Sequence, residues 1–522
     1  MVVTSHTLAT EVALAVLKKG GNAVDAAVTA GFALAVTQPL GKTGGDDESV
    51  AGQPDGGFKR LFERQSAVPV QSQGQPGNRA RHTCGFVGKP AAVLHHITVV
   101  ILKHGFGCPG RGFFAIVDRF DFAAIAGRIK HKAATADIAG AGLGYRKSKS
   151  CRHDGSAWQP GERFVQPDLA NTLERIANHG IHDFYQGETA ELIVEEMQRH
   201  DGLITLKDLR NYQPAIREPI HGTYRGHDIY SMSPPSSGGA HIVQILNILE
   251  GYAMAELGHN SAAGIHRMAE AMKLAYADRA TYLGDTDFVE VPLSGLTSKD
   301  YANSLRKGID ANRAHPSSDI QAGTPAAYES PETTHFSIVD RWGNAVSNTY
   351  TINFSYGSGI TVGGAGFLLN NEMDDFSAKP GEPNAYGLIG GEANRVEPGK
   401  RMLSSMSPTI VRRDGRNYLV TGSPGGSRII TTTLQVVLNV IDYNMNIQSA
   451  VSAPRIHHQW LPDELRIEQG ISPDTVRLLE EKGHKVVTGS AMGAIQSILI
   501  DSDGILNGGA DPRRSTSSAM GY

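Results

Sequence analysis

The spacing of apolar residues predicts a helical beginning for this chain. Apolar positions recur at helical spacing over residues 8–19, where Gly20-Gly21 ends the pattern, and an alanine-rich helix is expected over 25–36. The spacing returns after residue 155 and predicts further helices over 168–180, 189–199, 242–249 and 261–282. Between them, residues 224–230 read as a hairpin or a short strand.

Alternating apolar and polar positions predict strands in the second half. Residues 335–340 alternate, 341–344 supply a turn, and 345–353 return as a strand rich in Val, Thr and Tyr, so a β-hairpin is expected. Further strands are predicted over 418–422 and 494–500, and a helix over 429–443. The mixture favours an α+β or layered α/β/α fold.

Residues 42–152 depart from the rest of the chain in composition and in pattern. They hold 17 Lys and Arg against 8 Asp and Glu, a net charge of +9, so the remaining residues carry −13. All three cysteines lie here, and little sustained periodicity is present outside 93–102 and 112–125. One interpretation is a basic, poorly ordered insertion. The other is a stretch translated in the wrong frame, because the composition changes abruptly at both edges.

The overall composition narrows the class of protein. The chain has 522 residues, 40% of them hydrophobic, and a net charge of −4, which is typical of a soluble globular protein and lacks the basic excess that nucleic acid attracts. Three cysteines provide neither a disulfide framework nor a metal-binding spacing. No apolar run reaches the roughly 18 residues that span a bilayer. The N-terminal residues show no secretory signal, so a cytoplasmic protein is expected if the N-terminus is complete.

A threonine pair offers the first candidate chemistry. Residues 311–332 are rich in Pro, Ser, Ala and Gly and are expected to form an exposed linker, where processing is sterically possible. Cleavage between Glu332 and Thr333 would make Thr333 N-terminal, and its own α-amino group, with a pKa of about 7.7 to 8.0, could then act as general base for its hydroxyl. Alone, such a pair at a strand start usually reflects β-propensity.

Several short motifs occur in a fixed order around Thr333. They are Gly20-Gly21-Asn22-Ala23-Val24-Asp25-Ala26-Ala27, Pro234-Pro235-Ser236-Ser237-Gly238-Gly239, Thr333-Thr334-His335-Phe336-Ser337, Thr349-Tyr350-Thr351-Ile352-Asn353, Leu368-Leu369-Asn370-Asn371-Glu372-Met373-Asp374-Asp375-Phe376-Ser377, Ser404-Ser405-Met406-Ser407-Pro408 and Gly422-Ser423-Pro424-Gly425-Gly426-Ser427-Arg428. In combination and in order, these motifs resemble those of the γ-glutamyltranspeptidases, or glutathione hydrolases, which are self-processing N-terminal nucleophile hydrolases. The resemblance covers residues 1–40 and 155–522.

The resemblance implies a fold, a maturation step and a reaction. The fold is a four-layer αββα sandwich of the N-terminal nucleophile hydrolase type, formed as one intertwined domain by a large subunit of residues 1–332 and a small catalytic subunit of residues 333–522. Self-cleavage before Thr333 separates the two subunits. The mature enzyme would transfer the γ-glutamyl group of glutathione to water, an amino acid or a dipeptide through an ester on Thr333, without a metal or an organic cofactor. Family members of this kind also suggest a periplasmic or secreted protein.

The resemblance assigns catalytic and substrate-binding residues as well. Thr351 corresponds to the threonine that positions the nucleophile, and Gly425 and Gly426 correspond to the oxyanion hole, which needs two backbone N–H groups in a turn free of Cβ atoms. Two carboxylates and an amide oxygen suit the three donors of a substrate α-ammonium, and a hydroxyl pair suits the α-carboxylate. The residues in these two binding roles are Asn353, Glu372 and Asp375, and Ser404 and Ser405.

One family feature has no match in this chain. An arginine that pairs with the substrate α-carboxylate is expected within residues 42–152, and neither Arg60 nor Arg64 repeats the pattern around it. Because an arginine–carboxylate fork is a strong contact, its loss should weaken substrate binding. Two rival interpretations therefore stay open: a β-lactam or other amide acylase on the same fold, and an inactive chain that never matures.

Overall fold

The computed structural model describes residues 1–37, 86–88, 96–102, 135–137, 163–323, 334–353, 356–377, 379–380 and 391–522. Thr333 and most of the basic segment 42–152 lie outside these described residues. Three short strands of that segment are described, β2 (Phe86–Gly88), β3 (His96–Leu102) and β4 (Thr135–Asp137), and β3 falls within the periodic stretch at 93–102.

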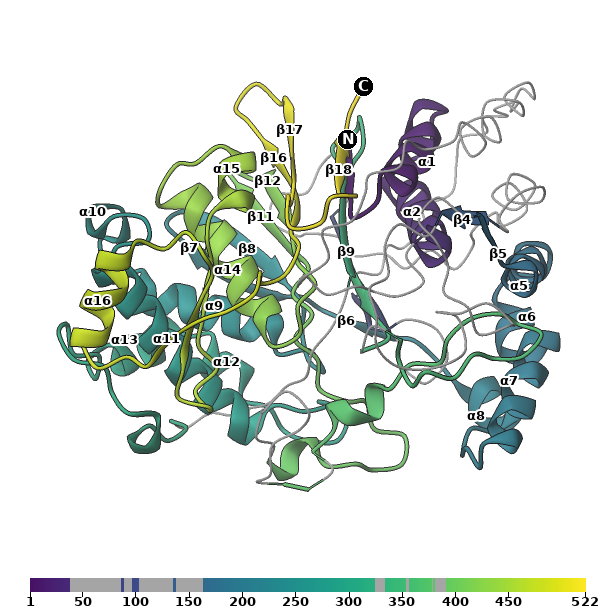
Figure 1. The fold of residues 1–522 in the computed structure, drawn as a ribbon, viewed down its shortest axis with the longest axis horizontal. Helices are drawn as coiled ribbons and strands as arrows, with labels where there is room; N and C mark the ends of the chain where they lie inside the picture. The colour runs from purple at the N-terminus through teal and green to yellow at the C-terminus, as the bar shows by residue number, and fades with distance from the viewer. Residues whose placement is uncertain are drawn as a thin grey trace, which may run out of the picture.

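A seven-stranded antiparallel sheet contains the predicted hairpin. Its strand order is β18 (Ser518–Met520), β1 (Val2–Thr4), β9 (Thr334–Val339), β10 (Ala345–Thr351), β3, β2 and β6 (Ala215–Arg217). The hairpin prediction is confirmed, because β9 and β10 pair with Thr334 opposite Tyr350. The two chain ends meet in this sheet, since β1 pairs with both β9 and β18 (Figure 1).

A six-stranded antiparallel sheet packs against the first one. Its strand order is β17 (Leu506–Ala510), β16 (Gln496–Ile500), β12 (Arg416–Thr421), β11 (Thr409–Arg413), β8 (His227–Ser231) and β7 (Ile220–Tyr224). A two-residue turn of Arg225 and Gly226, with φ of 45° and 77°, joins β7 to β8, so the pattern at 224–230 belongs to a hairpin. Strands β12 and β16 confirm the other two strand predictions.

The layers follow from the period-2 alternation of the strands. Val2 and Ile338 face helices α1 (Thr7–Lys18) and α2 (Ala23–Thr37), whereas their neighbours Val3 and Val339 face the second sheet and pack with Ile410. The far face of the second sheet is covered by α9 (Gly238–Leu249), α11 (Ala262–Tyr282) and α14 (Arg428–Ile441). The four-layer αββα arrangement and all these predicted helices are thereby confirmed (Figure 1).

The remaining helices and strands lie outside these four layers. A helical cluster at the right of Figure 1 packs through Leu173, Ile193 and Phe367 and comprises α5 (Pro167–His179), α6 (Ile181–Gln186), α7 (Glu188–Arg199) and α8 (Leu206–Asn211). The short elements elsewhere are α10 (Met254–Leu257), α12 (Leu293–Leu296), α13 (Lys299–Arg306), α15 (Ile447–Ser452), α16 (Pro473–Glu481), η1 (Ser317–Asp319), η2 (Glu372–Asp375), η3 (Glu392–Asn394), β5 (Arg163–Val165), β13 (Ile456–His457), β14 (Leu465–Ile467) and β15 (Val486–Thr488).

The predicted exposed linker is correct for much of residues 311–323 but wrong at positions such as Ser317 and Ile320, which are buried. Ser317 is 1% exposed and Ile320 is 8% exposed, and the indole Nε1 of Trp460 donates to both of their carbonyl oxygens, at 2.9 and 3.1 Å. The polar composition of this stretch concealed the contact because its partner lies about 140 residues further along the chain. Residues 324–332 lie outside the described part of the chain.

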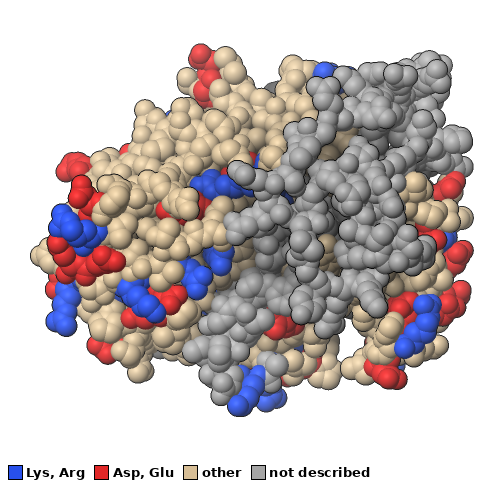
Figure 2. Space-filling view, in the orientation of Figure 1, with Lys and Arg blue, Asp and Glu red and all other residues tan. Residues whose placement is uncertain are grey.

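The described surface carries charges of both signs. On the face in Figure 2, Lys and Arg lie among Asp and Glu, which gives that part of the surface no extended field of one sign. Within the described residues, no helix is both long and apolar enough to cross a bilayer.

Candidate active site

Thr334, the residue after the predicted nucleophile, contacts residues near both ends of the chain. Thr334 is the first residue of β9 and is 5% exposed. Its hydroxyl lies 3.2 Å from the hydroxyl of Ser5 and accepts a hydrogen bond from Arg514 Nη1 at 3.4 Å. Contacts from both ends of the chain therefore hold the start of β9.

A tight turn follows the last residue of β10. Thr351 Oγ1 accepts the backbone N–H of Asn353 at 2.8 Å, and Asn353 adopts a left-handed φ of 68°. Asn353 Nδ2 donates to the carbonyl of Asn371 at 3.1 Å, while its buried Oδ1 has no hydrogen-bond partner within the described residues. The turn thus leaves an amide oxygen available to a donor such as an ammonium group.

Two buried carboxyl groups lie beside this amide on the 3₁₀ helix η2. Glu372 and Asp375 are 3% and 4% exposed, and their side chains hydrogen-bond to each other. Burial raises the pKa of Glu372 to about 8, against the opposing effects of the bonds to Asp375 and to the Asn353 backbone. A pair in this state holds a proton near neutral pH, and a bound cation could replace that proton.

The Pro-Pro-Ser-Ser loop, residues 234–237, hydrogen-bonds to the backbone of the serine pair. The carbonyl of Ser404 accepts the N–H of Ser237 at 2.8 Å and its hydroxyl at 2.9 Å, and the Ser404 N–H donates to Pro235 O at 2.7 Å. Ser404 Oγ accepts the Met406 N–H at 3.1 Å, and Ser405 Oγ accepts from Arg279 at 3.5 Å. Within the described residues neither hydroxyl hydrogen has an acceptor, so both can donate to an anion.

Asn394 joins the carboxyl pair to the serine pair, and sequence reasoning missed it. Its Nδ2 donates to the carbonyl of Asp375 at 2.7 Å, and its Oδ1 accepts the N–H of Leu403 at 3.1 Å. Both bonds are buried. A single asparagine in a glycine-rich loop carries no local signal, because its two partners lie 19 and 9 residues away.

The glycine pair forms a loop with positive φ angles just before α14. Gly425 and Gly426 have φ values of 133° and 64°, and a Cβ on Gly425 would lie 3.2 Å from Gly493 Cα. Their carbonyl oxygens accept the N–H groups of Arg428 and Ile429, at 3.1 and 2.9 Å. Neither glycine N–H donates a hydrogen bond within the described residues. This leaves two backbone donors at a helix N-terminus, which is the arrangement that an oxyanion requires.

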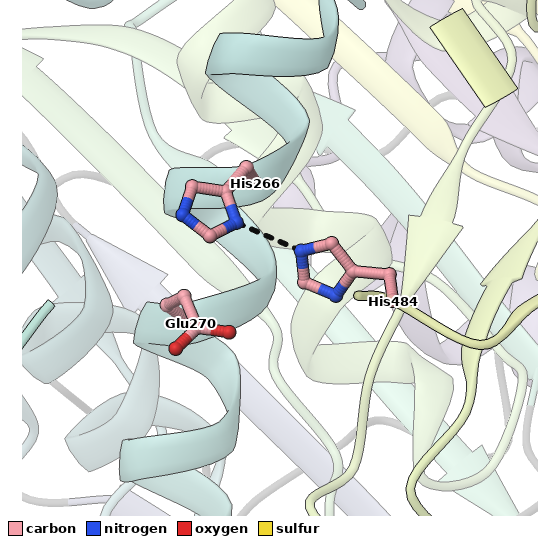
Figure 3. Close-up of side chains that lie close together, drawn as sticks. All are labelled: His266, Glu270 and His484. Atoms are coloured by element: carbon pink, nitrogen blue, oxygen red, sulfur yellow. Dashed lines mark hydrogen bonds between the residues drawn. The ribbon is translucent and has the colours of Figure 1, made fainter. Parts of the chain in front are cut away.

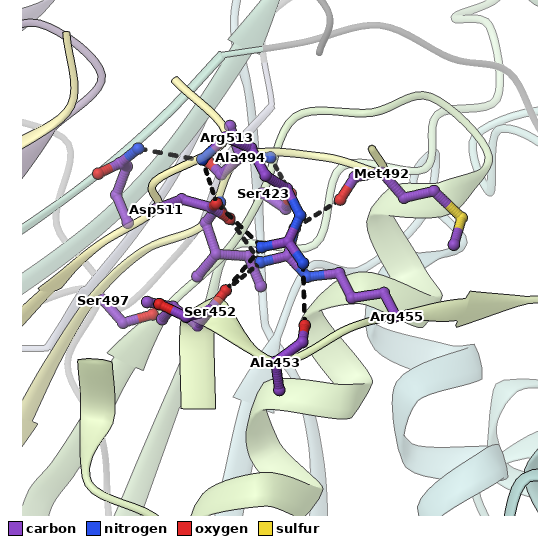
Figure 4. Close-up of polar contacts among 12 residues, drawn as sticks. Ser423, Ser452, Ala453, Arg455, Met492, Ala494, Ser497, Asp511 and Arg513 are labelled. Atoms are coloured by element: carbon purple, nitrogen blue, oxygen red, sulfur yellow. Dashed lines mark hydrogen bonds and ion pairs between the residues drawn. The ribbon is translucent and has the colours of Figure 1, made fainter. Parts of the chain in front are cut away.

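A buried ion-pair network lies close to Ser423, two residues before Gly425 (Figure 4). Arg455 pairs with Asp511 at 2.5 Å and donates to the carbonyl of Met492 at the same distance. Asp511 also accepts the N–H of Ile495 at 2.8 Å, while the neighbouring Ala494 N–H donates to Ser423 Oγ at 3.2 Å. The segment that touches Gly425 is therefore fixed by charge-assisted bonds.

The histidine of the Thr-Thr-His motif has a packing role. His335 is fully buried, and its Nδ1 and Nε2 lie 2.9 and 3.1 Å from the hydroxyls of Thr349 and Ser337. Burial lowers its pKa to about 3, so the ring is neutral. Its ring fills the space that a side chain at Gly422 would need, at 2.5 Å from the ideal Cβ, which ties β9 to the glycine loop.

One group of described side chains has metal-ligand chemistry, and it lies on α11 and after α16 (Figure 3). His266 Nδ1 and His484 Nε2 are 2.8 Å apart, whereas two ligands of a tetrahedral zinc stand about 3.3 Å apart. Glu270 is paired with the buried Lys273 at 2.6 Å, which already neutralises its charge. This geometry is that of a hydrogen-bonded histidine pair beside an ion pair.

Two facing antiparallel sheets enclosed by helices, with a threonine-containing strand tied to a glycine loop, form the αββα fold of the N-terminal nucleophile hydrolases. The γ-glutamyltranspeptidase family model matches residues 9–66 and 145–521. The chain is 48% identical to the glutathione hydrolase proenzyme of Escherichia coli over 535 residues, covering all of this chain and 92% of that protein. It therefore belongs to the γ-glutamyltranspeptidase family, whose members are enzymes.

Acylases are also similar to this chain. The acylase ACY 1 proenzyme of Pseudomonas sp. strain SE83 is 35% identical, with 98% of this chain and 91% of that protein covered. The crystal structure of cephalosporin acylase from Bacillus halodurans superposes with a TM-score of 0.73 at 24% identity, covering 100% of this chain and 96% of the other. At this identity the superposition supports the αββα fold alone.

Proposed function

We propose that this protein cleaves itself between Glu332 and Thr333 and then transfers the γ-glutamyl group of glutathione to water, an amino acid or a dipeptide. The observation that carries the proposal is that Asn394 hydrogen-bonds both to the loop of the carboxyl pair and to the loop of the serine pair. Carboxyl groups that can hold an α-ammonium lie on one side of Asn394, and hydroxyls that can hold an α-carboxylate lie on the other. A γ-glutamyl group presents both charges at one end.

The hairpin register supports Thr333 as the nucleophile. Thr334 of β9 pairs with Tyr350 of β10. If the antiparallel register continues by one residue, Thr351 would stand opposite Thr333. Attack by the Thr333 hydroxyl on the γ-carbonyl carbon would form an ester while the hydroxyl proton passes through the Thr333 α-amine to the departing amine. The N–H groups of Gly425 and Gly426 would stabilise the oxyanion, and water or an acceptor amine would then release the ester.

The acylases are the alternative within the same fold. An acylase needs a nucleophile and an oxyanion hole, but it has no need of a cage for a free α-amino and α-carboxylate group. A buried Glu372 beside the buried Asp375 is costly to maintain without a cation to bind, because burial penalises the charged form of Glu372. Their presence favours γ-glutamyl substrates. The expectation of an exported enzyme stays a prediction.

Mass spectrometry of the purified protein tests maturation. We expect two fragments, one ending at Glu332 and one beginning at Thr333, and a Thr333→Ala variant that stays intact under the same incubation. A wild-type chain that also stays intact would show that the protein does not mature. Release of the anilide from γ-glutamyl but not from α-glutamyl anilides then tests the substrate class, and equal release from both would contradict the proposed cage.

The basic segment, residues 42–152, can be tested separately from the active site. The family model leaves residues 67–144 unmatched, inside the segment whose composition fits either a basic insertion or a frame error. We propose that the carboxylate-binding arginine is missing because this segment is translated in the wrong frame. Resequencing of the coding region across residues 42–152 decides the matter: a corrected frame should restore the arginine, whereas an unchanged sequence would make the segment a true insertion.

A further inference from the structure

One turn of helix α11 contacts both the serine pair and the glycine loop of the proposed active site. Tyr276 and Arg279 are three residues apart on this helix and are 2% and 1% exposed. Residues at this spacing share one face of a helix. One of the two side chains reaches the serine pair and the other reaches the glycine loop, although α11 lies in the proposed large subunit and both loops lie in the small one.

The arginine reaches the serines. Arg279 Nε donates to Ser237 Oγ at 3.0 Å, and Nη2 donates to Ser405 Oγ at 3.5 Å. The Ser237 hydroxyl in turn donates to the carbonyl of Ser404 at 2.9 Å. The guanidinium thus bonds directly to Ser405 and, through one hydroxyl, to Ser404.

We propose that Arg279 is a positioning residue for the α-carboxylate of the γ-glutamyl donor; this inference rests on the proposed function. A guanidinium has only donors, so Ser405 Oγ must accept from it and must direct its own hydrogen elsewhere. That hydrogen is then set to donate to a substrate carboxylate. The permanent positive charge behind the hydroxyl also strengthens this bond in a water-poor site.

The Tyr276 ring and His241 lie close to Arg279. Its guanidinium lies 5.5 Å from the centre of the Tyr276 ring, and the His241 ring stacks on the Tyr276 ring with the two centroids 6.4 Å apart. Burial and the Arg279 charge lower the pKa of His241 to about 3, so this neighbour stays neutral. No second cation forms there at neutral pH.

The tyrosine provides a matched comparison for the arginine. Tyr276 Oη donates to the carbonyl of Ser427, the residue after Gly426, at 2.5 Å. Loss of this bond releases the glycine loop and leaves the serine pair untouched. Removal of either side chain disturbs the same turn of α11, but only Arg279 is expected to alter recognition of the carboxylate.

Calorimetric titration of the purified chain with L-glutamate and with 4-aminobutyrate tests the inference. The second ligand is L-glutamate without its α-carboxylate. We expect the wild type to prefer L-glutamate, and Arg279→Gln to weaken L-glutamate binding about tenfold, the equivalent of one charge-assisted hydrogen bond, while 4-aminobutyrate binding is unchanged. Tyr276→Phe should retain the wild-type preference.

The outcomes separate the inference from the proposed function. A wild type that binds both ligands equally would overturn the role of the serine pair, and with it the inference. A wild type that prefers L-glutamate, together with an Arg279→Gln variant that keeps that preference or loses both ligands equally, would overturn the inference alone. If Arg279→Gln does not fold, Arg279→Lys decides in the same way, because it keeps the charge but loses the bridging fork and should lose part of the preference.

Discussion

Replacement of Gly425 by alanine should lower the turnover number far more than it lowers stability. Its φ of 133° lies in a region that residues with a Cβ rarely adopt, and a strained residue there costs about 1–3 kcal/mol. The new Cβ would also lie 3.2 Å from Gly493 Cα and 3.4 Å from its nitrogen, so one of the two loops must move. The Arg455–Asp511 network restrains the second loop, and the movement therefore falls on Gly425 and Gly426.

The size of the effect on catalysis follows from that movement. The Cβ contacts alone require a shift of only a few tenths of an ångström, but relaxation of the alanine away from a φ of 133° would also turn the loop N–H groups away from the oxyanion. Loss of one oxyanion donor costs about a hundredfold to a thousandfold in kcat. We expect kcat for γ-glutamyl anilide hydrolysis to fall by at least about a hundredfold, with KM changed much less, because the proposed role of the glycines is to bind the oxyanion and not the α-carbon end of the substrate.

Gly504→Ala is the matched control. Gly504 has a φ of 81° in an exposed turn, and its Cβ would have no neighbour within 4 Å. Urea unfolding should show a loss of about 1 kcal/mol or more in this variant, with kcat unchanged. A Gly425→Ala enzyme that retains kcat within about twofold would refute the assignment of the oxyanion hole.

Three further predictions test the surroundings of the site. Asp511→Asn leaves the buried Arg455 without its charge partner and should destabilise the protein by about 3–5 kcal/mol in urea unfolding; a change below about 1 kcal/mol would contradict the supporting role of the network. Asn394→Ala leaves two buried backbone groups unpaired and should raise KM for the γ-glutamyl donor about tenfold or more, and an unchanged KM would show that the two binding groups do not depend on this bridge. Glu372 has a folded-state pKa of about 8, above its ordinary 4.5, so the stability that its protonated form contributes is complete below pH 4.5 and is lost as pH rises through 8. In urea unfolding between pH 6 and pH 9, Glu372→Gln should therefore lose less stability than the wild type. Identical slopes of stability against pH in the two proteins would contradict the raised pKa.

Patterns within single stretches of sequence determined much of the fold. The hairpin of β9 and β10 could be predicted because strand alternation and turn residues are local, and the helices because apolar spacing is local. The order of short motifs was sufficient to indicate the family. The same motifs placed Asn353, Glu372, Asp375, Ser404, Ser405, Gly425 and Gly426 in roles that stay predictions until they are measured.

Only the tertiary structure decided how these pieces are held together. Asn394 links two loops, Arg279 and Tyr276 support loops more than 100 residues away, and Trp460 holds a segment that composition alone marked as exposed. Such contacts join side chains whose local sequence is ordinary, and their geometry exists only once the two sheets have packed. Hydrophobic burial specifies the layers from local patterns, whereas the hydrogen bonds that align a site depend on which distant backbone groups the packed layers bring within about 3 Å.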